Sequence, residues 1–239
     1  MTHEAFRILG KSQPGGILVV SDHASNRVPD DIALGIAPEL LASHIAVDVG
    51  VAAIGAMMAQ QASFSAFQGH VSRLVCDFNR YPDSEGVVPV VSDGHAIPGN
   101  VGQRAARLER FFDPYHNALG QMLEEVPPAL ILSLHSFTPA LATCNKPRPW
   151  HVGVLYNQDD RAARVAIPML EADGLCVGDQ QPYSGVLLNA TMNRHCEAQG
   201  LPYLGIELRQ DMAGDPGQQP RLAQLLTRVC KEAALKLGE

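Results

Sequence analysis

Short apolar runs alternate with stretches of helical periodicity along the whole chain. Apolar runs of strand length, bounded by polar residues, are typical of buried strands, and apolar positions three and four apart are typical of amphipathic helices. The runs of strand length include residues 16–21, 64–67, 71–78, 129–134, 151–156 and 204–209. Helical periodicity covers residues 44–60, 101–123, 159–171, 191–199 and 221–237. This alternation, without an internal repeat, predicts one α/β domain over residues 1–239, with a mixed, mostly parallel central sheet flanked by helices.

The sequence of three segments qualifies this prediction. Residues 44–60 fit a helix capped by Ser43, although residues 44–48 also alternate as a strand does. Residues 81–99 are rich in Pro, Gly, Asp and Ser, which predicts a long loop. Pro114 lies inside the 101–123 periodicity, so we expect this helix to kink or split there.

Two of the apolar runs end in a histidine within a polar cluster. The run to Val20 is followed by Ser-Asp-His, which brings His23 to the end of a strand, and the run to Leu134 is followed by His135. In open α/β sheets, ligands bind beyond the carboxyl ends of the strands. A third strand carries a carboxylate, Glu207, inside it. We interpret His23 and His135 as metal ligands and Glu207 as a group that acts on metal-bound water.

The third metal ligand is open at this stage. A catalytic zinc ion takes three protein ligands. Asn26 follows His23 by three residues, but a neutral amide is a poor zinc ligand; Asp22 and Asp48 offer carboxylates. Asp48 lies in an apolar segment, where an unpaired charge is costly. We favour Asp48 as the ligand; the alternative is that Asp48 supports a ligating histidine from behind.

The remaining polar strand residues allow two interpretations each. Glu207 shares a strand face with Arg209, so the two could form a structural ion pair; the functional alternative makes Glu207 a general base. Arg73, Asn79 and Arg80 suit the recognition of a carboxylate, because the arginine fork donates two parallel hydrogen bonds. Their alternative is a surface salt bridge. Asn79 and Arg80 can act together only if the strand over residues 71–78 ends near Phe78.

Composition narrows the class of protein. Hydrophobic residues make up 46% of the chain and charged residues 18%, as in a folded globular domain. The net charge is −7 and no basic run is present, so we expect neither a nucleic-acid nor a membrane partner. Five cysteines without Cys-x-x-Cys spacing, no signal-peptide pattern and no apolar run of membrane-spanning length predict a cytoplasmic protein with reduced cysteines. We expect a small-molecule substrate; the oligomeric state is not encoded in these patterns.

Several blocks of the sequence together resemble the N-formylglutamate amidohydrolase family. They are Val20-Ser-Asp-His-Ala-Ser-Asn-Arg-Val-Pro29, residues 44–50, Ser72-Arg-Leu-Val-Cys-Asp-Phe-Asn-Arg80, Leu134-His-Ser-Phe137, Pro182-Tyr-Ser-Gly185 and Glu207-Leu-Arg-Gln-Asp211. Asp77-Phe-Asn-Arg80, Leu134-His-Ser-Phe137 and Glu207-Leu-Arg209 are also similar to blocks of the zinc carboxypeptidases. Asn26 stands where those enzymes have a glutamate ligand.

The resemblance implies a carboxypeptidase-like fold and metal-assisted hydrolysis of N-formyl-L-glutamate, or a related N-acyl amino acid, to formate and L-glutamate, a terminal step of histidine degradation. It implies Zn2+, or another divalent metal, on His23 and His135, and Glu207 as the base. It leaves the third ligand open among Asp48, which we favour, Asn26 and Asp22. Asn79 and Arg80 would bind the α-carboxylate, with Asn26 as a further substrate contact. Arg73 would stabilise the developing oxyanion.

Other assignments stay open on the residues alone. Arg27, Arg104 and Arg209 are all possible partners of the substrate's side-chain carboxylate. The alternative functions are a deacylase or carboxypeptidase acting on a different N-acyl amino acid or small peptide, and a non-catalytic carboxylate-binding protein on the same fold.

Overall fold

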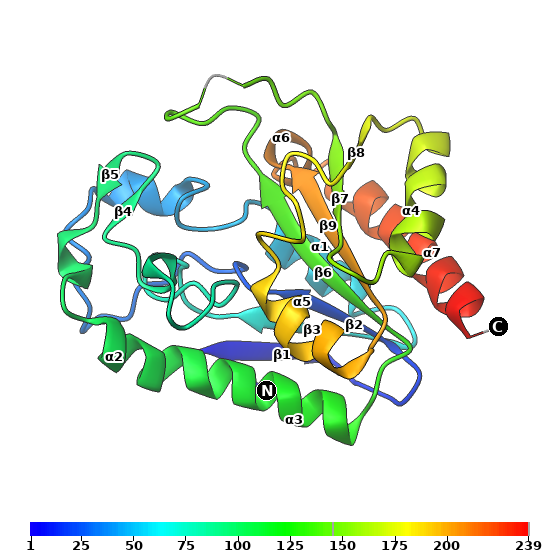
Figure 1. The fold of residues 1–239 in the computed structure, drawn as a ribbon, viewed down its shortest axis with the longest axis horizontal. Helices are drawn as coiled ribbons and strands as arrows, with labels where there is room; N and C mark the ends of the chain where they lie inside the picture. The colour runs from blue at the N-terminus through cyan, green and yellow to red at the C-terminus, as the bar shows by residue number, and fades with distance from the viewer. Residues whose placement is uncertain (145, 239) are drawn as a thin grey trace.

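A seven-stranded sheet runs through the centre of the protein in a computed structural model, which describes residues 1–144 and 146–238 (Figure 1). The strand order is β1-β3-β2-β6-β9-β7-β8. The strands are β1 (Phe6–Gly10), β2 (Ile17–Ser21), β3 (Phe64–Gly69), β6 (Leu130–Phe137), β7 (Val152–Leu155), β8 (Val177–Asp179) and β9 (Tyr203–Arg209). β1–β3 and β7–β9 are antiparallel and the other neighbouring pairs are parallel, which confirms the predicted mixed, mostly parallel sheet.

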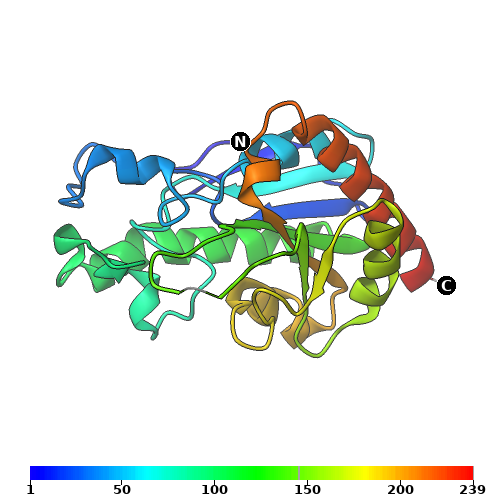
Figure 2. The same ribbon diagram turned by 90° about the horizontal axis from the view of Figure 1, so that it is seen from above.

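Helices cover both faces of the sheet (Figure 2). α1 (Val51–Met58), α4 (Arg161–Ala172) and α7 (Gln219–Leu237) pack on one face. α3 (Asp113–Glu125) and α5 (Ala190–His195) pack on the other. The three-layer α/β arrangement expected from the sequence is therefore present.

Alternation along the central strands decides which side chains enter which layer. In β6 and β9, Leu134 and Ile206 pack with the α1, α4 and α7 layer. The alternate positions on the same two strands, including Ile131 and Tyr203, face the α3 layer. Because side chains alternate along a strand, His135 and Glu207 lie on this second face, near the carboxyl ends of their strands.

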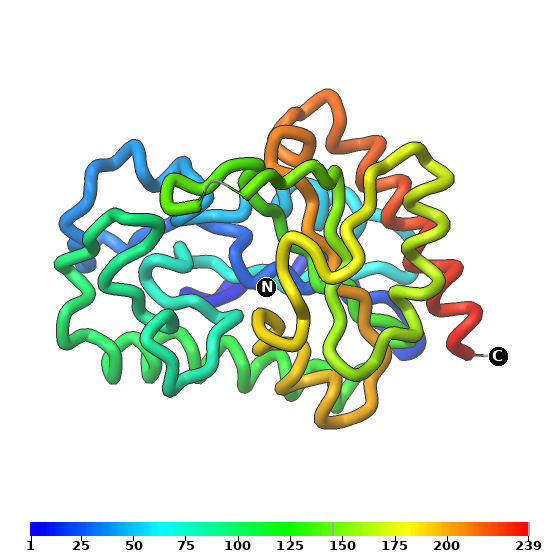
Figure 3. The backbone as a smooth tube through the Cα atoms, turned by 45° about the horizontal axis from the view of Figure 1, so that its top comes forward, coloured from blue at the N-terminus to red at the C-terminus, as the bar shows by residue number. Residues whose placement is uncertain are grey.

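The shorter elements lie mainly in the connections that extend beyond the sheet. They are η1 (Pro38–Ala42), η2 (Glu85–Val87), β4 (Val91–Ser92), β5 (His95–Ala96), η3 (Pro98–Asn100), α2 (Arg104–Arg107), η4 (Leu108–Phe112), η5 (Glu197–Gln199) and α6 (Gln210–Ala213). The long connections after β2 and β3 lie together at one end of the molecule (Figures 1 and 3). Within the described residues, the longest helices are too short or too polar to cross a membrane.

One predicted helix is shorter than expected, and one predicted strand is wrong. The helix predicted over residues 44–60 begins only at Val51, and residues 43–50 form turns, because the backbone N–H of Asp48 donates to the carbonyl of His23 at 3.0 Å. The strand predicted over residues 71–78 is a chain of turns instead, with Val75 and Cys76 N–H both donating to Ser72 O. Leu74, Val75, Cys76 and Phe78 are all fully buried, so the apolar pattern reflects a buried turn and not a strand.

The helix predicted to kink at Pro114 forms a continuous run of helical segments. α2 passes through the π-helical turn η4 directly into α3, whose second residue is Pro114. Inside a helical run, proline removes one backbone hydrogen bond and its ring crowds the preceding turn. The wider turn before it thus accommodates the proline.

Candidate active site

His23 and His135 meet at the carboxyl ends of β2 and β6 and turn the same atom toward one carboxylate. Nδ1 of His23 lies 3.3 Å from Oδ2 of Asp48, and Nδ1 of His135 lies 2.9 Å from the same oxygen. The ring centroids are 5.0 Å apart. All three side chains are buried, and one ligand atom from each lies within 4.8 Å of the others. The structure therefore brings together the three residues that the sequence analysis favoured as metal ligands.

Each ring also has a carboxylate behind it. Nε2 of His23 donates to Oδ1 of Asp77 at 2.7 Å. Nε2 of His135 lies 3.2 Å from Oδ2 of Asp22, a distance for an ion pair, although the angle is not that of a hydrogen bond. Carboxylates in this position orient metal-ligating imidazoles and raise their basicity. Asp22 contacts Nε2 of His135, which faces away from Asp48, so it lies behind a candidate ligand and not beside the Nδ1 atom.

Asp48 is held by three segments of the chain. Its Oδ2 accepts from the backbone N–H of Ser136 at 3.3 Å, and its Oδ1 accepts from Nη1 of Arg73 at 3.2 Å. Asn26, in contrast, is exposed, and it is not part of the lining of the cavity at this site in the described chain. The geometry brings Asp48, and not Asn26, to the two histidines.

Glu207 lies beside this group on the neighbouring strand. It pairs in register with His135 across β6 and β9 and is almost fully buried. Its Oε2 has no hydrogen-bond partner within residues 1–144 and 146–238. Burial, together with the nearby Asp48 charge, raises the pKa of Glu207 to about 7 against the opposing effect of His135. The structural ion pair with Arg209 is absent, since Arg209 pairs with Asp211 at 2.8 Å.

Arg73 and Asp77 are neighbours because residues 72–77 turn. The guanidinium donates to Oδ2 of Asp77 from Nε at 3.1 Å and from Nη2 at 2.7 Å, while Nη1 reaches Asp48. One arginine thus ties the candidate ligand Asp48 to the carboxylate behind His23. Arg73 therefore contacts both Asp48 and Asp77 and also lines the cavity.

Opposite charges lie next to one another throughout this cluster. Burial opposes ionisation of Asp48 and Asp77, yet His23, Arg73 and the hydrogen bonds outweigh burial, so both carboxyl pKa values are lowered. Burial also opposes protonation of His23 and His135, but the carboxylates around them raise both imidazole pKa values. His23, His135 and Asp48 form a donor set suited to a divalent cation. A cation held by the two Nδ1 atoms and Asp48 would leave each Nε2 facing its own carboxylate.

The cluster lines a cavity of about 120 Å3. Asn79 and Arg80 lie in this lining, as predicted, together with His44, Tyr183 and Leu188. Oδ1 of Asn79 accepts from the backbone N–H of Thr191 at 3.1 Å, and Nη1 of Arg80 donates to the Asn79 carbonyl at 3.3 Å. Arg80 Nε is 4.0 Å from Asp77, and Arg80 has no closer ion pair among the described residues.

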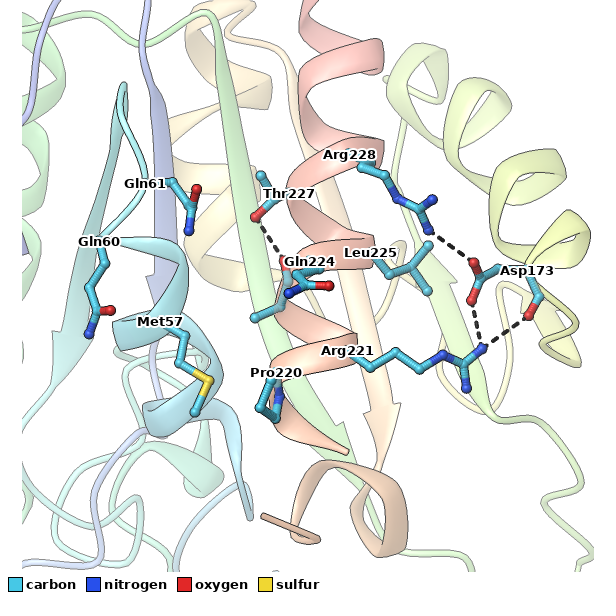
Figure 4. A pocket seen from close by; sticks show the side chains of 11 residues that line it. Met57, Gln60, Gln61, Asp173, Pro220, Arg221, Gln224, Leu225, Thr227 and Arg228 are labelled. Carbon is cyan, nitrogen blue, oxygen red and sulfur yellow. Dashed lines mark hydrogen bonds and ion pairs between the residues drawn. The ribbon is translucent and has the colours of Figure 1, made fainter. Parts of the chain in front are cut away.

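A larger cavity, of about 590 Å3, lies elsewhere, between α1 and α7 (Figure 4). Its three charged residues form one ion-pair cluster: Arg221 and Arg228 both pair with Asp173, at 2.7 and 3.0 Å. Its other polar lining consists of glutamine and threonine side chains. Size therefore does not locate the active site, whereas the cluster of histidines and carboxylates does.

Comparison with known families agrees with this geometry. The family model described as N-formylglutamate amidohydrolase matches residues 15–213. The chain belongs to the N-formylglutamate amidohydrolase family. The match includes β2, β6 and β9 and every candidate site residue named above. A search of curated proteins found no match.

Solved structures share the fold of this family member. The gene product Atu2144 of Agrobacterium tumefaciens is 28% identical, with a TM-score of 0.91 over 99% of this chain and 97% of that one. The N-formylglutamate amidohydrolase of Ralstonia eutropha JMP134 is 18% identical, with a TM-score of 0.79 over 98% of each chain. A zinc-free structure of YNDL, at 13% identity, has a TM-score of 0.51 over 96% of this chain and 91% of that one.

The three arginines considered for a second substrate carboxylate are engaged elsewhere in this family member. Arg27 donates to the carbonyls of Glu4 and His70, and Arg104 donates to Pro82 O. Arg209 pairs with Asp211, and none of the three belongs to the cavity lining in the described part of the chain. His44 and Tyr183 do line the cavity, and both fall in blocks that resemble the family, although no role was predicted for either of them.

Proposed function

We propose that the protein is a metal-dependent amidohydrolase that cleaves N-formyl-L-glutamate, or a related N-acyl amino acid, to the carboxylic acid and the free amino acid. The observation that carries the proposal is the buried arrangement of His23, His135 and Asp48 beside Glu207, whose Oε2 lacks a partner in the described residues. Membership of the amidohydrolase family supports the same reaction.

His23, Asp48 and His135 would hold the ion, Zn2+ or another divalent metal. When bound, such an ion polarises the substrate carbonyl and lowers the pKa of water. The protein's contribution is orientation: Asp77 and Asp22 fix the two imidazole rings, and Arg73 fixes Asp48. A site oriented this way requires little rearrangement on binding its ion.

Glu207 would be the general base. A carboxyl group with a pKa near 7 exchanges protons readily at neutral pH, which suits it to take a proton from the attacking water and return it to the leaving nitrogen. Asn79 and Arg80 would bind the α-carboxylate of the substrate. The N–H groups of Arg73 that remain free of Asp48 and Asp77 would face the developing oxyanion.

Formate release from N-formyl-L-glutamate tests this proposal directly. We expect purified protein loaded with zinc to hydrolyse the substrate, to lose activity on treatment with a chelator, and to regain it when zinc is added back. N-acetyl-L-glutamate and a dipeptide ending in glutamate serve as competing substrates. Protein that binds no metal, and releases neither formate nor another acid after zinc is added, would support the non-catalytic alternative. Release of formate and L-glutamate would match a terminal step of histidine degradation.

A further inference from the structure

Asp22, the carboxylate behind His135, is itself held by two hydroxyl groups from the helices on that face of the sheet. Its Oδ1 accepts a hydrogen bond from the hydroxyl of Tyr115, in α3, at 2.8 Å, and another from the hydroxyl of Thr191, in α5, at 2.9 Å. Tyr115 and Thr191 have no exposed surface, and Asp22 is 1% exposed. Segments far apart in the chain therefore meet inside the protein, behind one candidate metal ligand.

Both hydroxyl groups donate their hydrogen to Asp22. The Thr191 hydroxyl also lies 3.1 Å from the Phe78 carbonyl, but it has only one hydrogen, and the carboxylate is both nearer and charged. The Phe78 carbonyl already accepts from Nε2 of His116, at 3.1 Å. Burial and the Asp22 charge raise the pKa of Tyr115, so its phenol group remains a donor at neutral pH. Oδ1 of Asp22 thus accepts two hydrogen bonds from buried donors.

These two hydrogen bonds fix the direction of the other carboxylate oxygen of Asp22. Oδ2 lies 3.2 Å from Nε2 of His135 and has no hydrogen-bond partner among residues 1–144 and 146–238. A histidine that binds a metal through Nδ1 carries its hydrogen on Nε2, and the acceptor of that hydrogen sets the orientation of the ring. Asp22 can be this acceptor only while Oδ2 keeps its direction toward His135.

We propose that Tyr115 and Thr191 are positioning residues for the metal site: their hydroxyl groups orient Asp22, and Asp22 orients the imidazole of His135. This inference rests on the proposed function and extends the site from the candidate ligands into the layer of α3 and α5. The Tyr115 ring is held independently of its hydroxyl, because it stacks on Phe78 with centroids 4.0 Å apart and an angle of 3° between the planes. Removal of the hydroxyl alone therefore leaves the ring in place.

Variants that each lose one hydroxyl test the proposal through their affinity for zinc, measured by competition with a chelator on folded protein. We expect Tyr115→Phe and Thr191→Val to lower the affinity by about 3- to 10-fold, less than the loss of a whole carboxylate behind a ligand would. Thr191→Ser, which keeps the hydroxyl, should bind zinc as the wild type does.

Two matched controls lose hydroxyl groups that lie outside the cavity lining in the described chain. Tyr203→Phe removes a buried hydroxyl that donates to the carboxylate of Glu197 at 2.9 Å, and Thr227→Val removes one that donates to a backbone carbonyl in α7 at 2.7 Å. Both should keep the wild-type affinity. The visible absorption spectrum of the cobalt-loaded protein is a second readout, and it should change in Tyr115→Phe but not in Tyr203→Phe.

A double-mutant cycle shows whether the effect passes through Asp22. In an Asp22→Ala background, Tyr115→Phe should cause no further loss of zinc affinity, because residues that act through one shared partner are not additive. A loss as large as in the wild-type background would overturn the inference, as would wild-type affinity in both Tyr115→Phe and Thr191→Val. If Asp22→Ala does not fold, Thr191→Ser and the cobalt spectrum decide. Failure of the proposed function would show differently, as zinc-loaded wild-type protein that hydrolyses no N-acyl substrate.

Discussion

Glu207 is almost fully buried, and its Oε2 has no hydrogen-bond partner among the described residues. A substitution that keeps the shape of the side chain tests what its carboxylate contributes to catalysis. We expect Glu207→Gln to fold and to bind zinc as the wild type does, because the amide fills the same space. Turnover of N-formyl-L-glutamate should fall by about 10²- to 10⁴-fold, the usual contribution of a positioned general base. Formate release, metal analysis and thermal unfolding measure the three properties. Wild-type turnover in this variant would remove Glu207 from the mechanism.

Substitutions of Asp48 and Asn26 should have opposite effects on the amount of bound zinc. Asp48→Ala should lose bound zinc, since Asp48 faces both histidines, and Asn26→Ala should retain it, since Asn26 is exposed. Asp77→Asn should retain part of it, with an affinity lower by about 10- to 100-fold, as for other carboxylates behind a metal-ligating histidine. Metal content after dialysis against a weak chelator ranks the variants. Zinc lost from Asn26→Ala but kept in Asp48→Ala would reverse the assignment.

Arg80 should contribute to binding more than to the chemical step. Removal of a charged hydrogen bond costs about 1.5–3 kcal/mol, so Arg80→Ala should raise KM by about 10- to 150-fold with a smaller change in kcat. Arg104→Ala is the matched control, because Arg104 donates to the Pro82 carbonyl outside the cavity lining. An unchanged KM in Arg80→Ala would exclude Arg80 from the substrate site.

The predictable site residues are those whose positions follow from a regular element. His23 and His135 follow buried strands and Glu207 lies within one, so strand periodicity places all three at one edge of the sheet. Asp77 and His44 lie in turns, where spacing does not determine which side chains meet. The partnership of Asp77 with His23 could be found only from coordinates.

At the scale of elements, the turns over residues 43–50 are fixed by tight packing at their end. Gly50 has a φ of +86°, and a Cβ added to it would lie 1.9 Å from the Ala213 carbonyl oxygen. These turns carry Asp48, and they end where α1 begins. The close approach to Ala213 thus requires glycine on both conformational and steric grounds.

Gly50→Ala should lower the free energy of unfolding by more than about 2 kcal/mol, because backbone strain adds to a clash that only a backbone shift can relieve. Gly102→Ala is the matched control: its φ is +72°, but the added Cβ would meet open space, so we expect a loss of only about 1 kcal/mol. Denaturant unfolding of both variants measures the difference. Equal losses would show that the contact with Ala213 relaxes freely.

The late start of α1 and the absence of a strand over residues 71–78 share one cause. Residues 44–48 and 71–78 show apolar periodicity because they are buried, but their polar residues are directed into the site by turns. Periodicity reports burial and does not distinguish an ordered turn from a helix or strand. The site therefore appears where local sequence rules fail, whereas β6, β9, α4 and α7 follow the predicted patterns closely.

At the scale of the whole molecule, a pair of buried histidines joins α3 to α5 away from the candidate ligands. Nε2 of His116 donates to the Phe78 carbonyl at 3.1 Å, so its Nδ1 accepts from Nε2 of His195 at 2.9 Å. Burial, and the neighbouring His195, lower the pKa of His116 to about 3; burial and Arg194 lower that of His195 to about 4. Both rings are therefore neutral in the folded protein at neutral pH.

This pair predicts an acid-sensitive fold. The unfolded chain takes up protons on these histidines below about pH 6.5, but the folded protein does not until about pH 4, so stability falls as the pH drops through this window. The loss should reach about 2 kcal/mol per histidine at pH 5. His195→Gln should show a smaller loss between pH 6.5 and 5 by denaturant unfolding, and His95→Gln the same loss as the wild type. Identical slopes in all three proteins would contradict the prediction.

The pairing of β6 with β9 has a consequence for variation in chain length. His135 and Glu207 are opposite each other, and both flanking residues of Glu207, Ile206 and Leu208, enter the opposite, apolar layer. Deleting one residue from the first half of either strand would exchange the two faces from that point on, burying an acid or an imidazole among the helices and turning leucines toward the substrate. Insertions and deletions among descendants of this chain should therefore accumulate in the connections and spare these two strands.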